Sequence, residues 1–127
     1  MAKASSTQQV NEQWLSQACP FSVTLSALGH RWRAPILWKL LRGDRTFTDL
    51  TRSLPLVTEK MLAQELKRLQ VLGLVAKQGV ARQPLRTEYL PTDRGRSLDP
   101  ILAAMYAWGE VQQGLASNTV HATGDAQ

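Results

Sequence analysis

The residues best suited to bind another molecule lie on one face of a predicted helix that runs from Thr58 to Leu72. At about 100° per residue, the apolar side chains fall together on one arc: Met61, Leu62, Leu66, Leu69 and Leu72. The opposite face carries Lys60, Ala63, Gln64 and Lys67. Glutamine and lysine can hydrogen-bond to base edges in the major groove of DNA, and alanine can pack on a thymine methyl group. The alternative is that this face only contacts water, as most polar helix faces do.

Side chains around this face have the chemistry to hold phosphates. They lie on the preceding helix, on the helix itself and on a following hairpin: Arg52, Thr58, Lys67, Arg68, Lys77, Arg82 and Arg86. Thr58 either caps the helix or bonds to a phosphate, and Arg82 and Arg86 hold phosphates or reach the minor groove. We expect Lys60 and Gln64 to read bases while the other basic residues supply charge to the backbone.

Glu65 is the one residue that conflicts with the apolar arc of this helix, so its carboxylate must either be paired or lie at the edge of the core. A buried carboxylate needs a partner. Arg68, three residues further along the helix, is the candidate partner.

The positive charge of the chain is concentrated in its middle. The whole chain has a net charge of +5 and a pI near 9.9. Residues 31–96 contain fourteen Lys or Arg and six Asp or Glu, a net of +8, whereas the rest has one Lys and four Asp or Glu, a net of −3. This asymmetry favours a polyanionic partner.

Catalysis and metal binding are disfavoured by the distribution of reactive residues. An enzyme needs a nucleophile with a base, a carboxylate pair or a metal site. The soft ligands Cys19, His30 and His121 are not paired at metal spacing, and no glycine-rich phosphate loop follows a strand. We therefore expect no enzyme activity, no metal and no cofactor.

The composition is typical of a single cytoplasmic domain. Hydrophobic residues make up 43% of 127 residues, enough for a packed core. No apolar run approaches the roughly 20 residues that cross a bilayer, and no signal peptide opens the sequence. A single cysteine cannot form an internal disulfide. We expect no membrane partner.

The apolar periodicity and the helix-breaking residues predict the elements that position these side chains. Helices are expected over 10–18, 21–28, from Pro35 to Gly43, over 48–54 and 58–72, and from Ile101 to about Leu115. Strands are expected over 74–80 and 87–90, with a short extended segment over 45–47 and a turn over 93–95. This order predicts an α+β, mostly α, winged helix-turn-helix with a β-hairpin wing, whose second helix enters the major groove.

Several short motifs follow one another between Cys19 and Glu110. They are Cys19-Pro20, Gly29 to Trp32, Phe47 to Leu50, Lys60 to Leu62, Leu66 to Leu74, Glu88-Tyr89 and Thr92 to Gly95. Together they resemble the HxlR family of bacterial, MarR-like winged-helix regulators, over nearly three quarters of the chain. His30 and Pro35 depart from the family pattern, and neither lies on the proposed DNA face.

The resemblance implies a homodimeric DNA-binding transcription factor with a near-palindromic operator. Its dimer surface would come from the first and last helices: Val10, Trp14, Leu15, Leu102, Met105 and Trp108. The alternative is that these side chains complete the core of one subunit. The chain would then divide into an N-terminal arm and dimerisation helix (1–18), a winged-helix domain with a C-terminal dimerisation helix (19–115) and a disordered tail (116–127).

Two kinds of input signal are compatible with the sequence. Cys19 matches a position at which some members of the family resemble sensors of oxidants or electrophiles, and a helix N-terminus next to it would lower its pKa. The alternative is a buried cysteine that acts as a small hydrophobe. A small-molecule inducer could instead use a cavity lined by aromatic residues, although these more often form plain core: Trp14, Trp32, Trp38, Tyr106 and Trp108.

A rival function is a winged helix that assembles with other proteins and does not bind specific DNA. Such a surface would carry aromatic anchors and few lysines. The lysines of the Thr58 helix and the arginines of the hairpin favour DNA instead.

Overall fold

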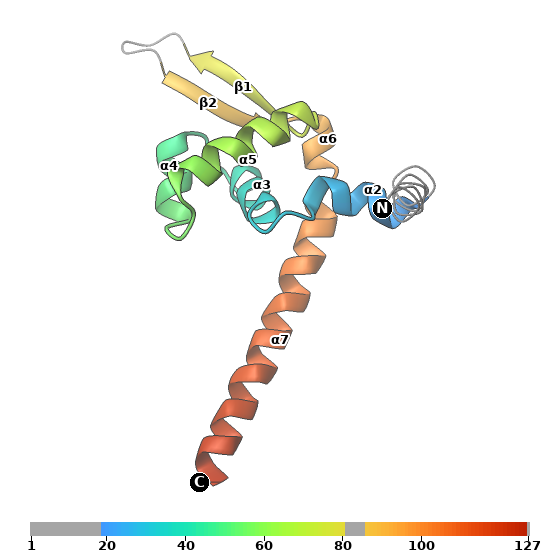
Figure 1. Cartoon of the computed structure of the whole chain (residues 1–127), viewed down its shortest axis with the longest axis vertical. Coiled ribbons are helices and arrows are strands. Elements are labelled where there is room, and N and C mark those ends of the chain that lie inside the picture. Colours follow the sequence, from blue (N-terminus) through green and yellow to red (C-terminus); the bar gives the residue numbers. More distant parts are fainter. Residues whose placement is uncertain (1–18, 81–85, 127) are drawn as a thin grey trace, which may run out of the picture.

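The computed structural model describes residues 19–80 and 86–126 of the chain. Its helices are α2 (Pro20–Leu28), α3 (Arg33–Leu41), α4 (Phe47–Ser53), α5 (Glu59–Val71), α6 (Asp93–Arg96) and α7 (Asp99–Ala126), and its strands are β1 (Val75–Val80) and β2 (Arg86–Pro91). Figure 1 shows α3, α4 and α5 grouped together beside the hairpin, with α7 projecting away from them. This is the predicted winged helix-turn-helix, mostly helical with one antiparallel hairpin.

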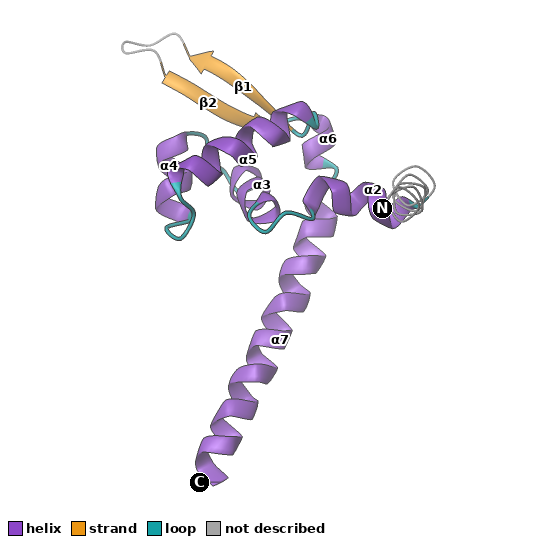
Figure 2. Cartoon of the chain, in the orientation of Figure 1, coloured by secondary structure: helices purple, strands orange, loops and turns teal. Residues whose placement is uncertain are grey.

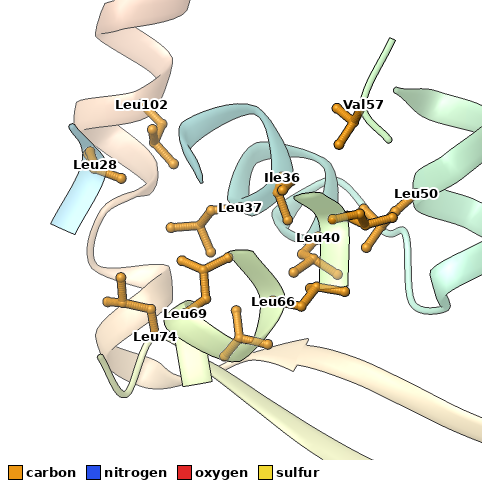
Figure 3. Close-up of a cluster of buried hydrophobic side chains, with 12 residues drawn as sticks. Leu28, Ile36, Leu37, Leu40, Leu50, Val57, Leu66, Leu69, Leu74 and Leu102 are labelled. Carbon is orange, nitrogen blue, oxygen red and sulfur yellow. The ribbon is translucent and has the colours of Figure 1, made fainter. Parts of the chain in front are cut away.

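Aliphatic side chains of α3 and α5 form the centre of the core (Figure 3). The most deeply buried are Ile36, Leu37, Leu40, Leu50, Leu62, Leu66, Leu69 and Leu74. The arc predicted for α5 is confirmed, because three of its leucines are buried while Met61 and Leu72 pack partly buried against the same core. Burial of one leucine stabilises a fold by roughly 1.5–3 kcal/mol. The core therefore determines which face of α5 points to solvent.

Threonine caps fix the starts of α4 and α5. The hydroxyl of Thr46 accepts a hydrogen bond from the N–H of Asp49 at 3.1 Å, and the Asp49 carboxylate accepts one from the N–H of Thr46 at 3.0 Å. This reciprocal pair is a capping box. The hydroxyl of Thr58 accepts from the N–H of Met61 at 3.1 Å, so the predicted capping role of Thr58 is confirmed.

Two glycines let the hairpin pack close to the end of α5. Gly73 has a φ of +74°, and the N–H of Leu74 donates to the carbonyl of Leu69 at 2.9 Å, which closes the last turn of α5. Gly95 lies so close to the carbonyl of Leu74 that a Cβ atom there would collide with it. The hydroxyl of Thr92 donates to the carbonyl of Gly73 at 2.6 Å. These contacts join α6 to the corner between α5 and β1.

The hairpin has a regular antiparallel register, from Val75 opposite Pro91 to Val80 opposite Arg86. The N–H of Tyr89 donates to the carbonyl of Arg45 at 2.6 Å, so the predicted extended segment touches the wing at Arg45. That segment ends earlier than expected, because Thr46 caps α4 and Phe47 is already helical.

Two other elements differ from expectation. Residues 93–95, predicted as a turn, belong to the short helix α6, whose N-cap Thr92 accepts from the N–H of Gly95. The last helix does not end near Leu115 but continues to Ala126, so most of the segment 116–127, expected as a disordered tail, is helical. No proline follows Pro100 to end the helix. The predicted arm over 1–18 lies outside the described residues.

Within residues 19–80 and 86–126, no helix is both long enough and apolar enough to cross a membrane. In the same part of the chain, no cluster of three or more His, Cys, Asp or Glu side chains could hold a metal ion.

Candidate nucleic-acid interface

The outer face of α5 presents the side chains expected to lie against bases. Lys60, Ala63, Gln64 and Lys67 are all exposed, on the side of the helix away from the buried leucines. Figure 2 shows α4 and α5 joined by a short loop, with the hairpin projecting beyond them. This is the geometry of a helix-turn-helix with a wing, in which the second helix enters a groove. Contact of these residues with DNA stays a prediction.

Glu65 lies on the inner face of α5 and is 5% exposed. Its partner is not Arg68, as the sequence suggested, but Arg33 of α3, whose Nε lies 2.8 Å from Oε2 of Glu65. The Nδ1 atom of His30 lies 3.3 Å from the other carboxylate oxygen. Arg68 is exposed to solvent on the same helix. A residue 32 positions away in the chain therefore neutralises this carboxylate.

The residues expected to contact phosphates surround α5. Arg52, Thr58, Arg68 and Lys77 are exposed on α4, at the N-cap of α5, on α5 and on β1. Arg86 is the first residue of β2, and its side chain is outside the described part of the structure. Arg82, which follows β1 in the chain, lies outside the described residues. The exposed basic groups that are described thus come from α4, α5 and β1.

Cys19 is the N-cap residue of α2 and is partly exposed. The backbone N–H groups of Ser22 and Phe21, at the start of the helix, hold the pKa of the Cys19 thiol below its usual value. The predicted placement at a helix N-terminus is therefore confirmed. Reactivity of this half-buried thiol stays a prediction.

The apolar residues expected at a dimer surface are found in different environments. Val10, Trp14 and Leu15 lie outside the described residues. Leu102 is only 3% exposed and belongs to the core of its own chain, so its assignment to a dimer surface is corrected. Met105 and Trp108 are exposed on α7, at 49% and 69%.

Exposed apolar residues on α2 were missed by the sequence reasoning. Phe21, Leu25 and Leu28 have the helical spacing behind the helix predicted over 21–28. Only Leu28 is buried, whereas Phe21 is 80% and Leu25 is 64% exposed. Spacing revealed a stripe of apolar side chains but not whether the stripe faces the domain's own core or another surface.

The start of α7 is attached to α3 through polar and aromatic contacts. Arg42 donates two hydrogen bonds to the Asp99 carboxylate, at 3.0 and 2.8 Å, which lower the pKa of Asp99 and raise that of Arg42. The rings of Trp38 and Tyr106 stack with their centroids 5.1 Å apart. The guanidinium of Arg42 lies 3.7 Å from the centroid of the Trp38 ring. These contacts fix the angle at which α7 leaves the domain.

A cavity of about 360 Å³ lies beside this junction. Its lining comes from α3, the end of α4 and α7: Ala34, Pro35, Trp38, Lys39, Leu54, Leu102, Met105 and Tyr106. Of the five aromatic residues considered for a cavity, Trp38 and Tyr106 line it. Trp32 packs against the core and Trp108 is exposed, while Trp14 lies outside the described residues.

Comparison with known proteins points to one family. A family model described as HxlR-like helix-turn-helix matches residues 27–116. A protein of Bacillus subtilis (strain 168), named as the uncharacterized HTH-type transcriptional regulator YdzF, is 40% identical over 106 residues, which cover 83% of this chain and 97% of that protein.

Two solved structures share the fold at similar sequence identity. The redox regulator HypR in its oxidized form has a TM-score of 0.70 and 32% identity, covering 73% of this chain and 96% of that one. The reduced form of the transcriptional regulator YodB from B. subtilis has a TM-score of 0.65 and 32% identity, covering 74% and 93%.

Proposed function

The chain belongs to the HxlR-like helix-turn-helix family of transcriptional regulators, and from this premise we propose that it binds a specific double-stranded DNA operator as a homodimer. One observation carries the proposal: α5 buries its leucines and turns Lys60, Gln64 and Lys67 to solvent. The family consists of regulators rather than enzymes, so the bound DNA is the ligand and not a substrate. We expect the protein to act in the cytoplasm.

In this proposal α5 lies in the major groove. Lys60 and Gln64 contact base edges, with Ala63 close to them, because these side chains supply donors and acceptors at the required length. The flanking basic residues hold the DNA backbone: Arg52, Lys67, Arg68, Lys77, Arg82 and Arg86. Thr58 primarily caps α5.

The dimer is proposed from the apolar surface that one subunit leaves exposed. On α7 this surface includes Met105, Trp108 and Val111, and on α2 it includes Phe21 and Leu25. Together with the predicted first helix, these side chains would be covered by a second copy. A two-fold axis would place two α5 helices roughly 34–36 Å apart, one turn of DNA, on a near-palindromic site.

We propose that Cys19 makes DNA binding responsive to oxidants or electrophiles. A lowered pKa increases the fraction of reactive thiolate at neutral pH. A single cysteine per chain limits the product to an alkylated thiol, a sulfenic acid or a disulfide between subunits. A small-molecule inducer in the cavity beside Trp38 and Tyr106 is the second candidate input.

The first experiment measures DNA binding by fluorescence anisotropy with reduced, purified protein. It compares a labelled duplex from just upstream of the protein's own gene with a scrambled duplex of equal length, at low and moderate salt. Tighter, salt-sensitive binding to the native duplex is expected. Equal weak binding to both would contradict a specific operator in that region, and no binding to either would favour the rival function, a protein-assembly module.

Two variants separate base reading from phosphate binding. Gln64→Ala should cost roughly 1–3 kcal/mol on the operator and little on random DNA. Arg82→Ala should weaken binding to both and reduce the salt slope by about one unit. Gln112→Ala, on α7, is the matched control and should change neither. Identical behaviour of the first two variants on both duplexes would refute the division of roles.

The sensing proposal is tested on the same operator before and after treatment with diamide or methylglyoxal. The wild-type protein should change its affinity, and the Cys19→Ser variant should not. Unchanged affinity of the treated wild-type protein would end the proposal of a thiol sensor.

A further inference from the structure

Arg33 is the hydrogen-bonding centre of a buried cluster that joins three elements. Its side chain is 11% exposed, and its Nε donates to the Glu65 carboxylate of α5 at 2.8 Å. Its Nη1 donates to the backbone carbonyl of Ser26 in α2, also at 2.8 Å. His30, in the turn between α2 and α3, faces the other oxygen of Glu65 at 3.3 Å. The cluster therefore fixes a point on α5 relative to both α2 and α3.

Among the buried residues of α5 in the described part of the chain, Glu65 is the only one that is not a leucine, so this cluster adds a directional contact to an aliphatic face. The buried leucines on that face are Leu62, Leu66 and Leu69. The free energy gained by burying apolar side chains depends on the area buried and has little directional preference. A charge-assisted hydrogen bond from a guanidinium depends on both distance and angle. Because Glu65 sits in the middle of α5, its bond to Arg33 fixes the rotation of the helix about its axis and its position along that axis.

The rotation of α5 matters for the proposed base contacts. Gln64 is the neighbour of Glu65, and Lys60 lies five residues before it on the same rigid helix. A hydrogen bond to a base edge requires a donor–acceptor distance within a range of about 0.5 Å. A small rotation of α5 would therefore move Gln64 out of reach of its base while its attraction to the phosphates remained. Loss of the directional contact should thus affect specific binding more than non-specific binding.

We propose that Arg33 and Glu65 are a positioning pair for DNA recognition, which sets the orientation of α5 against the DNA without touching it. This inference rests on the proposed function, since the pair acts through Lys60 and Gln64. Buried ion pairs often add little net stability compared with apolar residues of similar volume, while removal of one partner is costly. The role of this pair is therefore to fix geometry rather than to increase stability.

Two sets of substitutions separate geometry from stability. The double variant Arg33→Met/Glu65→Leu removes both charges and the directional hydrogen bond between them. Its apolar side chains still fill the buried space, so it should unfold at a urea concentration close to that of the wild type. Its preference for the operator over the scrambled duplex should fall about tenfold, with binding to the scrambled duplex unchanged. The variant Glu65→Gln keeps a carbonyl oxygen that can accept from Arg33 but leaves the arginine without a counter-charge. It should lose stability and retain most of the preference.

The control is Ile36→Val, which removes one buried methylene from α3 and leaves the Arg33–Glu65 pair intact. It should lower stability with no change in the preference for the operator. Anisotropy on both duplexes and urea unfolding are measured for all four proteins at one protein concentration.

The outcomes distinguish this inference from the proposed function. A wild-type protein without preference for the operator would overturn both. A wild-type preference that the double variant retains would overturn only the positioning role. Loss of preference in Ile36→Val in proportion to its loss of stability would show that stability alone governs specificity, which would also overturn the positioning role. If the double variant fails to fold, Arg33→Lys takes its place, because lysine keeps the counter-charge but not the rigid fork that reaches both Glu65 and Ser26. A reduced preference in Arg33→Lys would then support the pair, and a preference equal to that of the wild type would overturn it.

Discussion

At the scale of the residue, the charged side chains of α3 and α5 fall into two groups, buried and exposed. Arg33 and Glu65 are buried and paired, whereas Lys60 and Lys67 are exposed on the opposite face of α5. A buried charge without its partner is strongly destabilising, while an exposed charge contributes little to stability. The charges of Arg33 and Glu65 are therefore occupied by contacts within the fold, and the exposed lysines are available to bind phosphates or bases.

Substitution of Glu65 should reveal which arginine is its partner. Glu65→Ala leaves Arg33 buried without a counter-charge and should lower the free energy of unfolding by about 3–5 kcal/mol. Arg68→Ala removes only an exposed side chain and should change it by less than about 0.5 kcal/mol. Urea unfolding at pH 7 and equal protein concentration measures both. A comparable loss in the two variants would restore Arg68 as the partner.

Cys19 should ionise at a lower pH in the folded protein than in the unfolded chain. The N–H groups at the start of α2 stabilise the thiolate, which lowers the pKa, so the thiolate appears earlier as the pH rises. The rate of alkylation by iodoacetamide, measured against pH, should reach half its maximum at a lower pH in native protein than in urea. Coincident profiles would show that α2 does not activate the thiol.

The sequence could predict which residues of α5 point outward, because that depends only on helical periodicity. It could not predict the partner of Glu65. Local spacing suggested Arg68, but the partner comes from α3 through tertiary packing. In the same way, the spacing of Phe21, Leu25 and Leu28 predicted a helix, but only tertiary packing decides that Leu28 alone of the three is buried.

At the scale of the element, the helix ends that carry local signals were predictable. Thr58 caps α5 and Gly73 ends it, because both act through hydrogen bonds within a few residues. The end of α7 carries no such signal. The polar composition after Leu115 suggested disorder, but the absence of proline allows the helix to continue to Ala126.

The same substitution at two glycines should have opposite effects on stability. Gly95→Ala places a methyl group against the carbonyl of Leu74 and should cost about 1–3 kcal/mol, because the corner between α5, β1 and α6 must move. Gly109→Ala adds a methyl group to α7 where nothing lies within 4 Å, and should stabilise by up to about 1 kcal/mol. Thermal unfolding of both variants provides the test. A stable Gly95→Ala protein would mean that α6 does not pack as described.

At the scale of the whole molecule, the exposed apolar residues of α7 predict self-association. Trp108→Glu places a charge in the proposed interface and should shift the protein toward monomer, with weaker binding to a two-half-site operator. Gln113→Glu adds the same charge at an exposed polar position of α7 and is the matched control. Sedimentation velocity over a range of protein concentrations measures the shift. Equal association of the two variants would remove Trp108 from the interface.

Because α7 is long, a small change in its angle at the base moves its far end by a large distance. At a rise of about 1.5 Å per residue, its 28 residues extend over roughly 42 Å, so a tilt of about 10° at the base displaces the far end by about 7 Å. The pivot is the junction where Trp38 stacks on Tyr106 and Arg42 binds Asp99. If the far ends of α7 were held together in the proposed dimer, a change of angle at this junction would rotate each domain relative to α7 and so change the spacing of the two α5 helices.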